Sequence, residues 1–269
     1  MVIDFHAHIF KDELAAKGLS VLLKNSGNKI TPVTDMTGSS LMAYMDTAGV
    51  DLSVIQPVVT KVTQTVTVNE WAASLESDRI ISFGGIYPHT DDYKRDIDYV
   101  VSLGLRGLKF HAEYQDFVLD SPEMLRIYDY ALGKGLIILH HAGVDIGLPP
   151  PYKTSPRQFA AVADAMQGGF IVAAHFGGHE QWDDVEKYLV GHNIYLDTSM
   201  GFEYFCDDRF MRIARAHGTD KILFGSDSPW SAAKSELAHI DALPLSEEEK
   251  HAIKGGNAAK ILGLREKNV

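Results

Sequence analysis

Eight short apolar runs, rich in β-branched residues, alternate with longer amphipathic stretches along the 269-residue chain. This rhythm predicts repeated strand-helix units, because a strand covered by helices on both faces reads as a continuous apolar run. Eight such units favour a single, distorted (β/α)8 TIM barrel of the α/β class. The rival fold is an open doubly wound sheet, but Ile9-Phe10-Lys11 follows the first run where a glycine-rich dinucleotide loop would stand. The predicted strands span residues 2–8, 52–57, 80–87, 107–111, 136–141, 170–175, 194–197 and 222–227.

The segments between these runs carry helix signals. Ser121-Pro122 and Ser155-Pro156 each place a capping hydroxyl before a proline at the first helical position. Barrels of about 250 residues commonly form one unit, so residues 1–269 are expected to make a single domain. Helices are predicted at residues 39–47, 67–75, 93–103, 122–133, 156–166, 182–189 and 209–217.

Composition narrows the function classes. The chain has 36 acidic and 25 basic residues, a net charge of -11 and no dense Lys/Arg run, which argues against binding nucleic acid or an anionic membrane surface. Cys206 is the single cysteine, so no intramolecular disulfide forms and a cytoplasmic location is expected. The first residues contain neither a basic region nor a long apolar stretch, so we expect no signal peptide and no membrane anchor. A small-molecule substrate is the expected partner.

Polar residues gather at the ends of the predicted strands. In a parallel barrel all these ends meet at one edge, where catalytic side chains lie. His6 and His8 point to the same face because a strand has a period of two. Imidazoles and a carboxylate suit zinc and other divalent transition metals, so a metal site is predicted, with a hydrogen-bonded polar mouth without metal as the alternative. The strand-end residues are His6, His8, Lys109, His111, His140, His141, His175 and Asp227.

Several motifs together resemble the amidohydrolase superfamily, in the amidohydrolase-related branch that contains aminocarboxymuconate-semialdehyde decarboxylase and related hydrolases. The resemblance extends over nearly the whole chain and is specific for the branch, not for a substrate. The motifs are Asp4-Phe5-His6-Ala7-His8, the run from Gly104 to His111, His141-Ala142-Gly143, Ala174-His175-Phe176-Gly177-Gly178, the run from Phe224 to Trp230, and Gly256-Asn257-Ala258-Ala259.

The resemblance implies that His6, His8, His141 and Asp227 hold one divalent metal ion, expected to be zinc, with manganese and iron as alternatives. His175 is implied beside it as a catalytic or water-orienting base. Asp227 is also expected to act in catalysis by taking a proton from the metal-activated water.

Other strand-end residues are expected to meet the substrate. Lys109 either binds an anionic substrate group beside one metal or, when carbamylated, bridges two; the mononuclear case is favoured. His111 and Trp230 are predicted substrate contacts. Asp4 is expected either to orient a metal ligand or to have a structural role at the foot of its strand, and His140 is expected to pack between strand and helix. The remaining histidines are predicted to face water: His89, His179, His192, His217, His239 and His251.

The first expectation for the reaction is hydrolysis, in which a metal-activated water cleaves an amide, ester or lactone bond in a small molecule. The alternative is non-oxidative decarboxylation of an aromatic or muconate-like acid. A barrel that binds but does not catalyse is the third class, disfavoured because no expected metal ligand is missing. The segment 10–37 is expected to cover the pocket, and a homo-oligomer is expected by analogy.

Overall fold

The computed structural model describes residues 1–166 and 168–264. Within these residues eight strands form two parallel sheets, ordered β1-β2-β3 and β4-β5-β6-β7-β8. Strand neighbours in space are strand neighbours in sequence, as repeated strand-helix units require. The strands are β1 (Ile3–Ala7), β2 (Leu52–Ile55), β3 (Ile80–Ser82), β4 (Gly107–Phe110), β5 (Ile137–His140), β6 (Ile171–Ala173), β7 (Tyr195–Asp197) and β8 (Ile222–Leu223).

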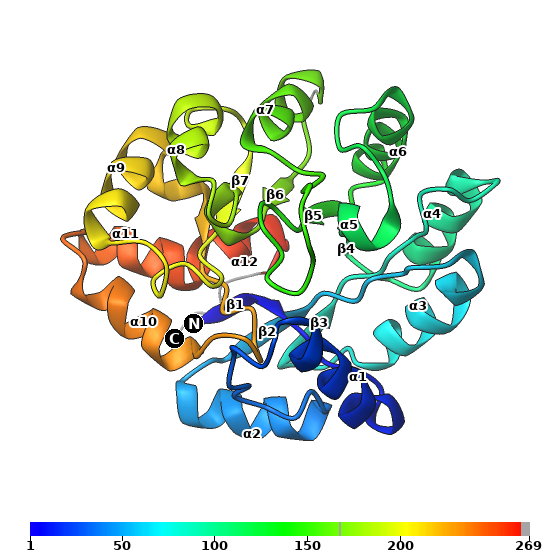
Figure 1. Cartoon of the computed structure of the whole chain (residues 1–269), viewed down its shortest axis with the longest axis horizontal. Helices are drawn as coiled ribbons and strands as arrows, with labels where there is room; N and C mark the ends of the chain where they lie inside the picture. The colour runs from blue at the N-terminus through cyan, green and yellow to red at the C-terminus, as the bar shows by residue number, and fades with distance from the viewer. Residues whose placement is uncertain (167, 265–269) are drawn as a thin grey trace.

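Backbone contacts join the two sheets into a closed barrel. Between β3 and β4, the Lys109 amide donates to the Gly84 carbonyl over 2.9 Å. Between β8 and β1, the Phe5 amide donates to the Phe224 carbonyl over 2.8 Å, and Ala7 pairs with Ser228 further along. The predicted (β/α)8 barrel is therefore confirmed, and Figure 1 shows the helices arranged as a ring about the strands.

The helices follow the predicted order. Ser121 and Ser155 accept hydrogen bonds from the backbone at Met124 and Gln158, which confirms both predicted caps. None of the described helices combines the length and apolar character needed to cross a bilayer. The α-helices are α1 (Asp12–Asn25), α2 (Gly38–Ala48), α3 (Thr65–Ser74), α4 (Tyr93–Ser102), α5 (Ala112–Gln115), α6 (Pro122–Gly133), α7 (Pro156–Ala165), α8 (Trp182–Asp184), α9 (Asp207–His217), α10 (Ala233–Ala242), α11 (Glu247–His251) and α12 (Asn257–Ile261).

The structure differs from the predicted elements in three respects. Most strands end before the predicted residues, because the chain turns into a loop where the site side chains begin. The predicted helix at 182–189 is the short α8 followed by a π-helical turn, η3 (Val185–Leu189). The segment 10–37, expected only as a cover, contains the 14-residue helix α1.

The barrel interior is a packed apolar core. Phe5, Phe83 and Leu139 are fully buried there, and α12 closes the core from outside the sheet with Ala258 and Ile261. A second apolar layer lies between the strands and the surrounding helices. Since the interior is filled, a substrate has room only at the carboxyl ends of the strands, where the loops begin.

Candidate metal centre and active site

His6 and His8 form a matched pair at the end of β1. The Nδ1 atom of His6 lies 2.9 Å from Asp197 Oδ2, and that of His8 lies 3.1 Å from the Gln56 carbonyl oxygen. Both partners accept hydrogen bonds, so each Nδ1 carries the proton and each Nε2 presents a lone pair. The two Nε2 atoms are 3.1 Å apart.

Asp227 joins this pair from the loop after β8. Its Oδ1 lies 3.3 Å from His6 Nε2 and 3.0 Å from His8 Nε2. Its amide donates to the His6 carbonyl over 2.7 Å, which fixes the loop against β1. Asp227 has a φ of 60°, a conformation that non-glycine residues seldom adopt and that is often found at functional sites.

The charge states of these groups suit a cation. Burial and the nearby Lys109 ammonium lower the pKa of His6 to about 4, so its ring is neutral at neutral pH. Burial alone would raise the pKa of Asp227, but His6, His8 and His175 hold it well below its usual value. Two imidazole lone pairs and a carboxylate oxygen therefore converge, and these atoms repel one another unless a cation lies between them. The residues fit a divalent transition metal.

Lys109, on β4, reaches the same cluster. Its Nζ lies 3.0 Å from His6 Nε2, and its side chain is fully buried. Burial lowers the pKa of Lys109 to about 8, although Asp227 and Asp197 act in the opposite direction. The structure thus places a cation or, if carbamylated, a ligand beside the centre; both readings of Lys109 stay predictions.

His175 and His141 form a second pair beside the first. His175 Nε2 and His141 Nδ1 are 3.0 Å apart, and His175 Nδ1 lies 3.2 Å from the Ser199 carbonyl oxygen. His175 Nδ1 is therefore the donor to Ser199, and His175 Nε2 accepts from His141. His141 Nε2 is then a buried lone pair without a hydrogen-bond partner among the described residues.

The structure brings three of the four predicted ligands together. Donor atoms of His6, His8 and Asp227 lie within 4.8 Å of one another, as do those of His6, His175 and Asp197. His141 falls instead into a third group, with His111 and Asp145. Its role as a ligand stays a prediction, and its free Nε2 is the atom that could serve.

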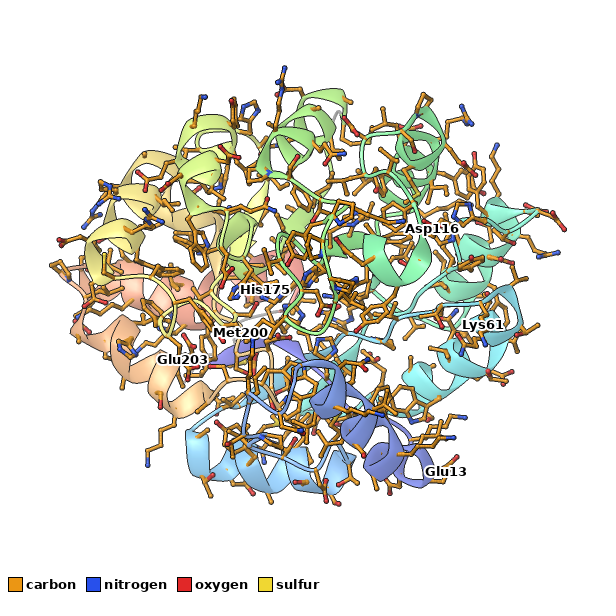
Figure 2. The ribbon with its side chains drawn as sticks, viewed as in Figure 1. Glu13, Lys61, Asp116, His175, Met200 and Glu203 are labelled. Atoms are coloured by element: carbon orange, nitrogen blue, oxygen red, sulfur yellow. The ribbon has the colours of Figure 1, made fainter. Side chains whose placement is uncertain are left out.

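A cavity of about 510 Å³ opens above these residues. His111 lines it and is held between Glu113 Oε2 at 3.3 Å and Asp145 Oδ2 at 3.1 Å. Trp230, a predicted substrate contact, also lines it. Figure 2 places His175 and Met200 near the centre of the ring of helices.

The cavity walls are largely apolar. Segment 10–37 supplies a large share of the cavity wall, so this segment lies beside the cavity that opens above the candidate metal centre. The apolar wall residues include Phe10, Leu14, Leu22, Ile30 and Met36 from this segment, and Val58, Val68, Trp71, Ile146, Met200 and Trp230 from other loops and helices.

Two predictions about histidines are wrong. His179 and His217 are buried, not facing water. The backbone of His179 pairs with Gly143 of the preceding loop, and His217 Nε2 bonds the Ile194 carbonyl over 2.8 Å. His89, His239 and His251 are exposed and His192 is partly exposed.

His140 and Asp4 lie away from the imidazole cluster. His140 packs among aromatic rings between β5 and its helices, as predicted. Asp4 accepts hydrogen bonds from the amide of Ser226 over 2.9 Å and from its hydroxyl over 2.5 Å, so it ties β1 to the loop after β8. From His6, Asp4 accepts a hydrogen bond only from the backbone amide, over 3.2 Å, so it does not orient the His6 ring.

Asp197 is the residue that sequence reasoning missed. It is fully buried, orients His6, and accepts from the amides of His175 and Ser199 over 3.0 Å and 3.1 Å. The signal was present, because Asp197 ends a predicted strand at the same edge as the other site residues. Strand-end position alone would have identified it.

Comparisons with known proteins agree with this architecture. The sequence profile described as Amidohydrolase matches residues 3–264. No curated protein matches the chain by sequence.

Solved structures match over nearly their full length. A 2,6-dihydroxybenzoate decarboxylase from Rhizobium has a TM-score of 0.70 at 14% identity, covering 97% of this chain and 98% of that one. The 5-carboxyvanillate decarboxylase LigW2 from Novosphingobium aromaticivorans, with bound manganese, has a TM-score of 0.71 at 15% identity, covering 98% and 97%. A probable 2-pyrone-4,6-dicarboxylic acid hydrolase from Acinetobacter baumannii has a TM-score of 0.68 at 14% identity, covering 98% of this chain and 99% of that one. These likenesses show the barrel fold, and the profile match, which extends over almost the whole chain, shows that the protein belongs to the amidohydrolase family.

Proposed function

We propose that this protein is a metal-dependent decarboxylase that removes carbon dioxide, without an oxidant, from a small aromatic carboxylic acid. The observation that carries the proposal is a buried lysine beside the candidate metal centre, on the floor of a cavity with largely apolar walls. A carboxylate fits the floor and an aromatic ring fits the walls.

The positively charged side chains that line the cavity favour a substrate with one carboxylate over a substrate with two. Among the described lining residues two are lysines, Lys11 and Lys109, and none is arginine. Lys109 lies at the metal cluster, and Lys11 precedes α1. A second carboxylate buried in the apolar part would lack a partner, at considerable cost. This argues against a dicarboxylic acid as substrate.

His6, His8 and Asp227 would hold the metal ion, with His141 Nε2 as the fourth proposed ligand. The bound ion supplies positive charge that offsets the negative charge of the substrate. Zinc, manganese and iron all suit this donor set, and the manganese in LigW2 supports testing manganese first.

The side chains have separate tasks in the reaction. Lys109 Nζ binds and orients the carboxylate. Breaking the bond between ring and carboxyl group leaves the electron pair on the ring carbon and releases carbon dioxide. That carbon then needs one proton, which Asp227 takes up from solvent and delivers, as a carboxylate within reach of the reacting atom can. His175 lines the cavity beside His6, with the two ring centroids 5.3 Å apart, and its ring positions the substrate.

Hydrolysis was the first expectation from the sequence, and the comparisons support it less well than decarboxylation. The matched structures include two kinds of aromatic-acid decarboxylase, although a probable hydrolase also matches. None of the described lining residues is an arginine that could pair with the second carboxylate of a dicarboxylic acid.

The two reactions can be separated in one assay. Protein loaded with manganese or zinc is incubated with two aromatic monocarboxylates, 2,6-dihydroxybenzoate and 2-hydroxybenzoate, and with representative lactones, esters and amides. Release of carbon dioxide is followed by a coupled assay and hydrolysis by chromatography. Carbon dioxide from an aromatic acid supports the proposal, whereas hydrolysis without any decarboxylation would overturn it.

A further inference from the structure

We propose that His179 is a specificity-determining residue, which hydrogen-bonds a hydroxyl group on the ring of the aromatic carboxylate bound in the cavity. The inference rests on the proposed function for the class of substrate. It adds the recognition of a second group, away from the reacting carboxylate, by a residue outside the predicted metal and catalytic set.

The backbone of His179 is held firmly between two loops of the barrel. Its amide donates to the Ala142 carbonyl over 2.9 Å, and its carbonyl accepts from the Val144 amide over 3.0 Å. Gly143 has a φ of +89°, and a Cβ there would lie 2.2 Å from the His179 nitrogen. This close approach fixes the loop after β6 against the loop after β5, as a binding residue requires.

The ring of His179 is oriented by aromatic neighbours and faces the cavity. Trp182 and Tyr204 contact it edge-on, with centroid distances of 5.4 Å and 4.5 Å. The ring lies 6.0 Å from that of His175 and is one of the groups lining the cavity. It therefore reaches the bound substrate from beside the candidate catalytic histidine.

Both ring nitrogens of His179 lack a hydrogen-bond partner among the described residues, although the residue is only 2% exposed. Buried polar groups are nearly always satisfied, and leaving them unpaired costs free energy. A polar group on the substrate would supply the missing partner.

His140 shows that a buried, unpaired histidine ring is not by itself evidence for a contact with substrate. Its ring nitrogens also lack partners, but aromatic rings including Phe110, Tyr128 and Phe159 surround it. It is not among the cavity-lining residues. Of these two histidines, only His179 lines the cavity.

The chemistry of the ring selects a hydroxyl group. Burial and the neighbouring His175 lower the pKa of His179 to about 3, so the ring is neutral at neutral pH. A neutral imidazole has one donor and one acceptor nitrogen. A hydroxyl group both donates and accepts, whereas a carboxylate only accepts and would gain no ion pair here.

The test measures equilibrium binding instead of turnover. Benzoate and its 2-, 3- and 4-hydroxy derivatives are titrated by calorimetry into metal-loaded wild-type protein and into His179→Phe. One net hydrogen bond corresponds to about a 2- to 12-fold gain in affinity. At least one hydroxybenzoate should therefore bind wild-type protein more tightly than benzoate by such a factor, and His179→Phe should lose this preference while keeping its affinity for benzoate.

Two further variants make the result decisive. His140→Phe replaces a buried histidine whose two ring nitrogens also lack partners among the described residues, but which does not line the cavity, and it should keep the preference. His179→Gln retains a donor and an acceptor and should restore part of it, even if the phenylalanine variant folds poorly. An undiminished preference in both His179 variants would overturn the role of His179 alone. Failure of all four benzoates to bind wild-type protein would overturn the substrate class itself.

Discussion

Replacing Asp197 with asparagine should weaken metal binding while leaving the barrel folded. In the wild-type protein Oδ2 accepts from His6 Nδ1 over 2.9 Å. Oδ1 accepts from the amides of His175 and Ser199 over 3.0 Å and 3.1 Å, and also from the Ser199 hydroxyl. Asparagine has a single side-chain oxygen, and the two amides and the Ser199 hydroxyl already donate to the oxygen at that position. Its NH2 group must therefore face His6 Nδ1.

The size of the expected loss in metal affinity follows from the tautomer of His6. An NH2 group cannot accept a hydrogen bond, so His6 must move its proton from Nδ1 to Nε2. The Nε2 lone pair, which faces His8 and Asp227, is then lost to the metal. Removing such a supporting partner typically costs 10- to 100-fold in metal affinity, or about 1.4–2.7 kcal/mol.

A competition titration with a fluorescent zinc chelator measures the affinity, and circular dichroism checks the fold. Asp164→Asn is the matched control, because Asp164 bonds His192 Nδ1 over 2.8 Å at an exposed site. Loss of that exposed pair should change neither the zinc affinity nor the fold. If Asp197→Asn binds zinc as tightly as the wild type, the tautomer argument and the assignment of His6 as a ligand are both wrong.

Three other changes test the remaining assignments. Asp227→Asn should abolish turnover with little change in thermal stability, since the shape is kept; unchanged activity would refute its catalytic role. Burial raises the pKa of Glu236 from 4.5 to about 8, so its contribution to stability is complete below pH 4.5 and is lost as the pH rises through 8. Glu236→Gln should therefore reduce the difference between the urea-unfolding free energies at pH 5 and pH 9, and an unaltered difference would contradict the argument. Gly143→Ala should lower the free energy of urea unfolding by more than about 2 kcal/mol, because the added Cβ would clash with the backbone of His179. Gly135 has a similar φ but open space around it, so Gly135→Ala should lower the free energy of unfolding by less. Equal decreases in the two variants would show that the close approach to His179 does not matter.

The barrel could be predicted because its signal is local. Each buried strand is an apolar run, and the helices alternate with these runs; two of the helices carry caps that the sequence reveals, at Ser121 and Ser155. The pairing of His6 with His8 follows from the period of a strand. The strand ends were less accurate, because His175 and Asp227 turn the chain at positive φ, which neighbouring residues in the sequence do not reveal.

Burial of individual polar groups could not be predicted in the same way. His217 bonds the carbonyl of Ile194, and His179 lies against Trp182 and Tyr204 on a loop that returns to Gly143. These contacts depend on how segments that are separate in the sequence meet in space: the end of α9 with the residue before β7, and the loop after β6 with the loop after β5. A histidine in a loop or at the end of a helix is more often exposed, so the general expectation failed at these two positions.

The order of apolar and polar residues along the chain was sufficient to determine the barrel, the edge at which the candidate site lies, and most of the residues found there. This is possible because hydrophobic burial acts on every strand-helix unit separately. The state of each imidazole was decided only by the tertiary structure. Asp197 lies 191 positions from His6 in sequence, yet its carboxylate determines which nitrogen of that ring is free to bind a cation, because hydrogen bonding depends on distance in space.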